Sequence, residues 1–92
     1  MDEAVVNAAH HHRYELEAGG KKALAYYRIA NGVITFTHTI VPDAMRGQGI
    51  GSRLIRAALA DVRKRGLKVV ATCPFVRDYI ERHSEEQDLL AD

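Results

Sequence analysis

The stretch Pro42-Asp-Ala-Met-Arg-Gly-Gln-Gly-Ile-Gly-Ser52 decides the fold, because it joins a β-patterned run to an amphipathic helical run. Three of the seven glycines in the chain fall here, at the alternate positions 47, 49 and 51. Glycine lets backbone N–H groups turn toward a ligand, and the helix that follows adds its unpaired N–H groups and the positive end of its dipole. The stretch is therefore typical of a site that holds an anion, usually a phosphate.

Two common glycine loops do not fit these letters. A Walker loop needs a lysine directly after its second glycine, and no lysine follows Gly51. The dinucleotide fingerprint needs a further glycine three residues after its second one, and Ser52 stands at that position. A turn without a ligand is the remaining alternative, but three alternating glycines carry an entropic cost that a simple turn does not require.

The residues before this stretch predict an antiparallel sheet. Tyr14 and Leu16 alternate with polar residues and are expected to face the core. Asn31-Gly32 predicts a two-residue hairpin, because both positions of such a turn favour positive φ. The expected strands are 13–17, 23–29 and 33–41, with a weaker signal at 5–6.

The residues after it predict a helix and then a parallel strand. Apolar residues recur every fourth position from Ile50 to Val62, and Gly66 stands where a left-handed C-cap would end the helix. The apolar run 67–71 has the character of a strand covered on both faces. A right-handed crossover then makes this strand parallel to the strand 33–41.

Pro74 suits the first turn of a second helix, with Phe75, Tyr79 and Ile80 expected on its inner side. The predicted fold is thus α/β of the α+β kind: a mixed, mostly antiparallel sheet with one parallel βαβ crossover and two main helices. Ninety-two residues suffice for one core, so we expect a single compact domain over residues 1–92.

The glycine stretch carries a family resemblance. Its Arg46-x-x-Gly49-x-Gly51 pattern resembles the pyrophosphate loop of the GNAT superfamily, the acetyl-CoA-dependent N-acyltransferases. The resemblance to the compact single-domain branch covers about residues 13 to 90 and includes His38-Thr39, Gly66-Leu67-Lys68-Val69-Val70, Cys73-Pro74-Phe75-Val76 and Tyr79-Ile80-x-Arg82-His83. It implies a GNAT-like sheet in which the two parallel strands splay apart to admit the pantetheine arm of CoA.

The resemblance also implies a cofactor site on these strands and this loop. Backbone groups of Ile40 and Val41 would pair with the pantetheine amides, as an added strand pairs with a sheet edge. Arg46 would contact the pyrophosphate or brace the loop from outside. The amides expected around the pyrophosphate are those of Gly47, Gln48, Gly49, Ile50, Gly51 and Ser52.

Three side chains are candidates for the chemistry. His38 is expected on one strand face with Ile34, Phe36 and Ile40, and its near-neutral reference pKa suits a general base. Cys73 directly precedes a helix, where a thiolate is favoured, so it is either a nucleophile that forms an acetyl-cysteine or a residue lining the acyl pocket. Tyr79 resembles the tyrosine of the superfamily that protonates the CoA thiolate. Plain packing is the alternative for both His38 and Tyr79.

Composition narrows the classes of function. Thirteen basic and twelve acidic residues give a net charge of +1, which favours neither nucleic acid nor a membrane surface. No apolar run reaches the roughly 20 residues of a membrane span, and one cysteine fits a reducing compartment, so a cytoplasmic protein is expected. We expect no metal, because the neighbouring side chains of His10 to His12 would point to opposite faces of a strand; a polar turn or the start of a strand is the simpler interpretation.

These patterns predict an acetyl-CoA-dependent N-acetyltransferase that acts on an amine of a peptide, a protein or a small molecule. The chain lacks the length for the extra helices that wall the acceptor site in most GNAT domains, so the acceptor face should be open. A monomer or weak dimer is expected. The alternative is a non-catalytic module that binds acetyl-CoA or CoA.

Overall fold

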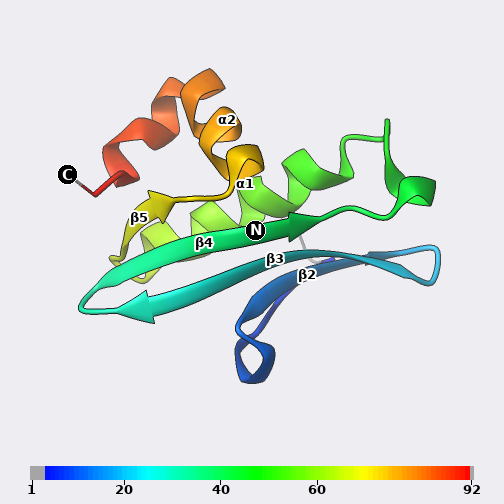
Figure 1. Cartoon of the computed structure of the whole chain (residues 1–92), viewed down its shortest axis with the longest axis horizontal. Coiled ribbons are helices and arrows are strands. Elements are labelled where there is room, and N and C mark those ends of the chain that lie inside the picture. Colours follow the sequence, from blue (N-terminus) through cyan, green and yellow to red (C-terminus); the bar gives the residue numbers. More distant parts are fainter. Residues whose placement is uncertain (1–3, 92) are drawn as a thin grey trace.

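The computed structural model describes residues 4–91 and arranges their strands in one five-stranded sheet of order β1-β2-β3-β4-β5 (Figure 1). The first four strands pair antiparallel in sequence order, and β5 runs parallel to β4. The bounds are Val5–Ala8 for β1, Arg13–Ala18 for β2, Lys21–Ala30 for β3, Val33–Ile40 for β4 and Lys68–Ala71 for β5. The predicted fold class is confirmed.

The turns of the meander follow their sequences. Asn31 and Gly32 have φ of 54° and 77°, so the hairpin between β3 and β4 has the two positive φ angles that the Asn-Gly pair predicts. Between β1 and β2 lies the short 3-10 helix η1 (Ala9–His11), followed by His12 in the left-handed region. The three histidines therefore form an exposed polar turn, as their simpler interpretation predicted.

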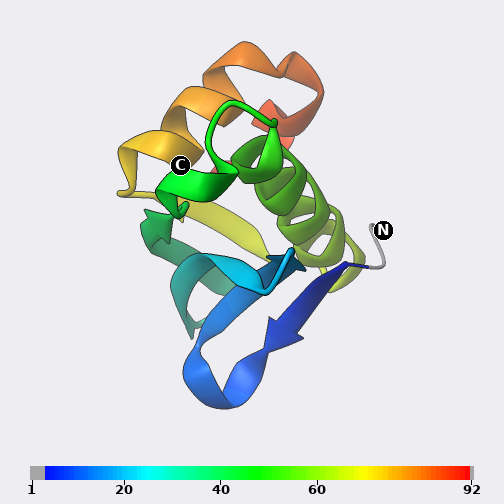
Figure 2. The same ribbon diagram turned by 90° about the vertical axis from the view of Figure 1, so that its right-hand side faces the viewer.

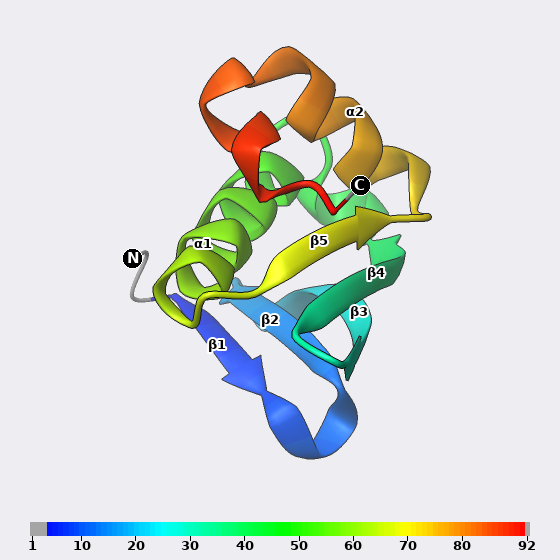
Figure 3. The same ribbon diagram turned by 90° about the vertical axis from the view of Figure 1, so that its left-hand side faces the viewer.

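Two α-helices, α1 (Ile50–Lys64) and α2 (Pro74–Arg82), lie over the same face of the sheet (Figures 2 and 3). Gly66, at φ 71°, follows the end of α1, as its position predicted. Among residues 4–91, buried side chains of the sheet and of both helices form one core, which includes Tyr14, Leu16, Ile34, Phe36, Leu54, Ile55, Val62, Val76 and Ile80. No helix of the described chain covers the opposite face of the sheet, which we call the open face.

A bulge in β4 changes which of its side chains reach the core. His38 pairs with Tyr26 and Phe36 pairs with Tyr27, so Thr37 between them has no partner on β3. Directly paired residues of neighbouring strands point to the same face. The extra residue therefore shifts the alternation along β4 by one position.

The pairing of β4 with β5 ends at Phe36, one residue before the bulge. The last paired residues are Phe36 and Ala71, and the Phe36 carbonyl then accepts hydrogen bonds from Thr72 N at 3.2 Å, Thr72 Oγ1 at 2.9 Å and Cys73 N at 3.1 Å. The chain turns there into α2, while β4 continues to Ile40. Within the described residues, the end of β4 is thus left without a β5 partner, which agrees with the predicted separation of the two strands.

The C-terminal segment is fastened back onto α1 and β5. It forms the 3-10 helix η3 (Ser84–Leu89), after which Leu90 forms an isolated bridge with Val69. Arg63 of α1 donates hydrogen bonds to Asp88 at 2.8 and 2.9 Å, and Leu89 is buried. Leu90 and Ala91 therefore lie beside β5.

Candidate functional site

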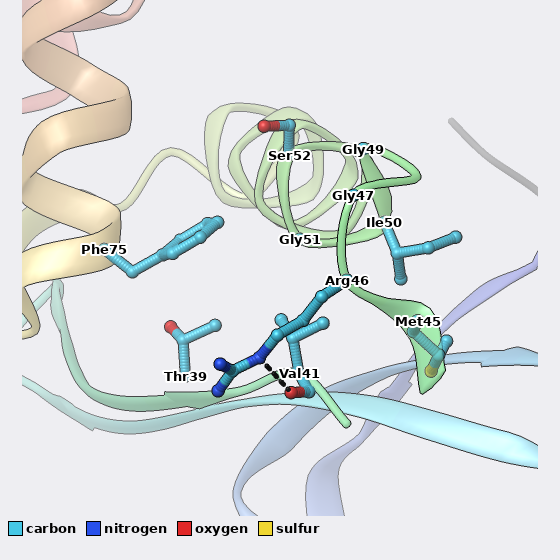
Figure 4. A pocket seen from close by; sticks show the side chains of 10 residues that line it. All are labelled: Thr39, Val41, Met45, Arg46, Gly47, Gly49, Ile50, Gly51, Ser52 and Phe75. Carbon is cyan, nitrogen blue, oxygen red and sulfur yellow. Dashed lines mark hydrogen bonds between the residues drawn. The ribbon is translucent and has the colours of Figure 1, made fainter. Parts of the chain in front are cut away.

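A cavity of about 370 Å³ lies where β4, the glycine loop and the two helices meet (Figure 4). Its walls come from the end of β4, the 3-10 helix η2 (Asp43–Met45), the loop after it, the first turn of α1 and the first turn of α2. The lining residues are Thr39, Val41, Met45, Arg46, Gly47, Gly49, Ile50, Gly51, Ser52 and Phe75. The stretch that decides the fold thus also forms one side of this cavity.

The loop is shaped by glycines in the left-handed region. Gly47 has φ of 80°, and Gly49, at φ 71°, is the N-cap of α1. Arg53 N donates to Gly49 O at 3.0 Å and so closes the first turn. The N–H groups of Ile50 and Gly51 precede that bond, and such groups have no partner within a helix. They lie beside the cavity, where they can hold an anion.

Gly51 is required by a close approach rather than by its φ. A Cβ at this position would lie 2.5 Å from Cζ of Phe75, because the ring of Phe75 packs on the backbone of α1. Phe75 was predicted to lie on the inner side of α2, and this prediction is wrong: its side chain is 40% exposed at the cavity, and Val76 is buried in its place. The ring therefore forms a wall of the site (Figure 4).

Arg46 bridges the loop and the end of β4. Its Nε lies 3.4 Å from the carbonyl oxygen of Val41 and 3.3 Å from Asp43 Oδ1, and its side chain is 71% exposed. The guanidinium reaches across the cavity wall toward β4 (Figure 4). This position braces the loop and also leaves cationic N–H groups at the edge of the cavity.

Most of the predicted cofactor residues are brought together here, and two are not part of the lining. Gln48 donates from Nε2 to Ala44 O at 3.2 Å, and the Ile40 side chain is on the open face, paired with Leu24. Thr39, Met45 and Phe75 line the cavity without having been singled out for it. Met45 carried a usable signal, since it is an apolar residue within a polar stretch.

Cys73 lies at the inner end of the site, next to Thr39. The Sγ of Cys73 is 3.3 Å from Thr39 Oγ1, and Cys73 is 5% exposed. Its N–H bonds to Phe36 O, and its carbonyl accepts from Arg77 N at 3.0 Å. Cys73 therefore sits in a fixed position where β4 and β5 separate.

The prediction that His38 shares a face with Phe36 is wrong. Because Thr37 is the bulged residue, His38 and Ile40 point to the open face, while Thr39 shares the core-side face with Phe36. His38 is exposed, and its ring meets that of Tyr26 edge-on with centroids 6.4 Å apart. His38 and Cys73 consequently belong to opposite faces of the sheet.

Tyr79 is not brought to the cavity. It is buried and stacks on His83, with ring centroids 3.9 Å apart, and His83 Nδ1 lies 2.7 Å from the Tyr79 carbonyl oxygen. Burial raises the pKa of the Tyr79 hydroxyl, with a smaller contribution from Glu86. Its ring lines a second hollow that shares Ser52 and Phe75 with the first but includes neither Thr39 nor Cys73.

The remaining sequence features add no further centre. Within residues 4–91, no three side chains of histidine, cysteine, aspartate or glutamate are grouped so that they could hold a metal ion. No helix of the described chain is both long and apolar enough to cross a bilayer.

A family model for the GCN5-related N-acetyltransferase matches residues 13–89. The chain belongs to this family. The matched residues include the glycine loop, the strands β4 and β5, and both α-helices. The family expected from the sequence is confirmed.

Relatives and a solved structure agree with this assignment. The chain is 35% identical over 69 residues to Protein NATD1 of Gallus gallus and of Homo sapiens, which covers 75% of this chain and 63% and 61% of those proteins. It thus spans less than two thirds of the length of these relatives. The NMR solution structure of a GCN5-like N-acetyltransferase candidate from Staphylococcus aureus matches with a TM-score of 0.74 at 26% identity, over 99% of this chain and 91% of that chain.

Proposed function

We propose that this GCN5-related domain binds acetyl-CoA and transfers its acetyl group to an amine. The observation that carries the proposal is the cavity of about 370 Å³, which joins the amides at the start of α1 to the part of β4 that β5 leaves unpaired. A site of this shape offers anion-binding groups at one end and a strand edge at the other. Those are the two features that a diphosphate attached to an amide-containing arm requires.

The pyrophosphate of acetyl-CoA is assigned to the loop. Gly47 and Gly49 hold the backbone in the left-handed region, and the first turn of α1 presents its N–H groups at the cavity. A negative group near a helix N-terminus gains from both the N–H groups and the dipole. Arg46 adds a positive charge at the same edge, while Gln48 contributes its backbone amide only.

The pantetheine arm is assigned to the free edge of β4. Backbone groups of Ile40 and Val41 lie beyond Phe36, where pairing with β5 has ended. An extended amide-containing arm can hydrogen-bond there in place of the missing strand. This places the thioester inward from Val41, toward Thr39 and Cys73.

In the proposed reaction, the nitrogen of the acceptor amine attacks the thioester carbonyl carbon. The new C–N bond forms as the C–S bond breaks; the amine loses one proton, and the departing CoA thiolate gains one. We assign the approach of the amine to the open face, where His38 can accept its proton. For Tyr79 to give the thiolate its proton, its ring would have to leave the stack on His83, which lies away from the cavity.

Calorimetry with acetyl-CoA, ATP and NAD tests the binding step. We expect acetyl-CoA to bind and the two nucleotides to bind much more weakly, because they lack the arm that pairs with β4. Equal affinity for all three would contradict the assignment of the strand edge. Thiol release with a panel of amines and peptides then tests transfer, and His38→Ala should lower turnover while it leaves the Kd of acetyl-CoA unchanged.

One observation favours the alternative, a domain that binds acetyl-CoA without transferring the acetyl group. His38 and Cys73 lie on opposite faces of the sheet, and no other element among residues 4–91 walls an acceptor on the open face. If acetyl-CoA binds and a broad amine panel gives no turnover above background, this alternative is supported. A covalent route through Cys73 is tested by intact mass: an acetyl adduct that disappears in Cys73→Ser supports it, and no adduct in rapidly quenched samples refutes it.

A further inference from the structure

Thr39 lines the cavity, and the side chain of Cys73 lies directly behind it. Thr39 is part of the cavity lining, and the Sγ of Cys73 fills the space against its hydroxyl at 3.3 Å. Cys73 is 5% exposed and does not appear in the lining of either hollow described above. We therefore treat the two side chains as one wall, in which a group that enters along β4 meets Thr39 first and Cys73 behind it.

The wall is held from both sides. Cys73 N is bonded to Phe36 O, Cys73 O is bonded to Arg77 N, and Pro74 fixes the backbone that follows. Thr39 is held by its pairing with Ala25, which is fully buried. Neither side chain can move far without disturbing the point where β4 and β5 separate.

We propose that the Thr39–Cys73 pair sets the length of the acyl chain that the site accepts, so that acetyl-CoA is selected over propionyl-CoA and butyryl-CoA. The proposal rests on the proposed function, which places the thioester inward from Val41. At that point the acyl group is the part of the ligand that points to the wall. Each added methylene must then displace the Thr39 side chain or the Cys73 Sγ behind it, and both extend from backbone that is fixed by hydrogen bonds.

The size of the effect follows from general packing. One methylene too many or too few in a fitted pocket changes discrimination by about 10-fold to 200-fold. We therefore expect butyryl-CoA to bind at least about 10-fold more weakly than acetyl-CoA. Cys73→Ala removes Sγ and should bring the ratio of the two Kd values close to one, mainly by improving the binding of butyryl-CoA.

The experiment is calorimetry of the full chain with CoA, acetyl-CoA, propionyl-CoA and butyryl-CoA. Cys73→Ala is compared with Thr39→Ala, which opens the same wall from the other side. Thr35→Ala, on the open face of β4, is the matched control and should keep the wild-type ratio of the two Kd values. Thr39→Ala keeps the test valid if Cys73→Ala does not fold, which circular dichroism would show. A selectivity change in these variants cannot come from a merely structural role, which would weaken all four ligands alike.

Two results overturn the inference. If the wild type binds butyryl-CoA as tightly as acetyl-CoA, or if both wall variants keep the wild-type ratio, the pair does not set chain length; the proposed function still stands in either case, because acetyl-CoA binds. If no CoA ester binds to the wild type, the proposed function fails and the inference fails with it.

Discussion

Replacing Gly51 by alanine tests whether the contact between α1 and Phe75 shapes the binding site. The added Cβ would lie 2.5 Å from Phe75 Cζ, and carbon atoms prefer about 3.5 to 4.0 Å, so the ring must shift by about 1 Å or more. Phe75 is 40% exposed, which leaves the ring free to turn. The variant should therefore fold, with its ring displaced from the wall of the cavity.

Two opposing effects set the stability of this variant. Alanine is favoured over glycine within a helix by about 1 kcal/mol. A side chain forced away from its preferred rotamer costs about 0.5 to 1.5 kcal/mol. We expect the free energy of unfolding to change by less than about 1 kcal/mol, while the Kd of acetyl-CoA rises at least about tenfold, which corresponds to about 1.4 kcal/mol.

Urea denaturation and calorimetry measure the two quantities. The double variant Gly51→Ala, Phe75→Ala removes the clash and should bind more tightly than Gly51→Ala alone. Gly66→Ala is the control: unlike Gly51, Gly66 has a positive φ, at 71°, and its Cβ would meet no atom within 4 Å. It should lose stability by about 1 to 2 kcal/mol and keep the wild-type Kd. An unchanged Kd in Gly51→Ala would refute the role given to this contact.

Three further predictions concern the loop, the core and the C-terminal segment. Gly49→Ala places a Cβ at φ 71°, so we expect a loss of about 1 to 2 kcal/mol in the free energy of unfolding together with weaker binding of acetyl-CoA; wild-type values of both would contradict the strain at the N-cap. Tyr14→Phe removes a 2.7 Å hydrogen bond from the buried hydroxyl to the Asp61 carboxylate and should cost about 1.5 to 3 kcal/mol in urea denaturation, since no other contact of the ring is lost. Arg63 lowers the pKa of Asp88 below its reference value of 3.8, so stability from this pair is present above that value and is lost as the pH falls through the lower pKa of the folded state. In Arg63→Gln, the decrease in melting temperature between pH 6 and about pH 3 should be smaller than in the wild type; an equal decrease would show that this pair does not contribute.

The elements and their order could be predicted from the sequence because their signals are local. The Asn31-Gly32 turn, the apolar stripe from Ile50 to Val62 and the glycine after it each depend on residues close together in the chain. The same holds for the loop, whose left-handed glycines have the positions that the spacing indicated. The family assignment rests on these features as well, and the match over residues 13–89 confirms it.

The residues that line the cavity could be predicted only in part. Backbone groups of the loop were identifiable because glycine spacing marks them directly. Phe75 could not be recognised, since α2 is distant in sequence from the loop. Thr39 could not be recognised either, because only the bulge at Thr37 turns it to the core side. Phe75 in particular lies outward because α1 approaches it closely at Gly51. The spacing of apolar residues along α2 cannot reveal a contact with another helix.

The glycine stretch by itself determined that an anion-binding turn joins a strand to a helix, because glycine is the residue that adopts positive φ without a steric cost. Tertiary structure alone decided which chemistry the neighbouring strand offers. A single unpaired residue, Thr37, reverses the faces of β4, so that Thr39 joins Cys73 and His38 turns to the open face. A bulge arises from how two strands pair, and the alternation of residues along one of them cannot reveal it.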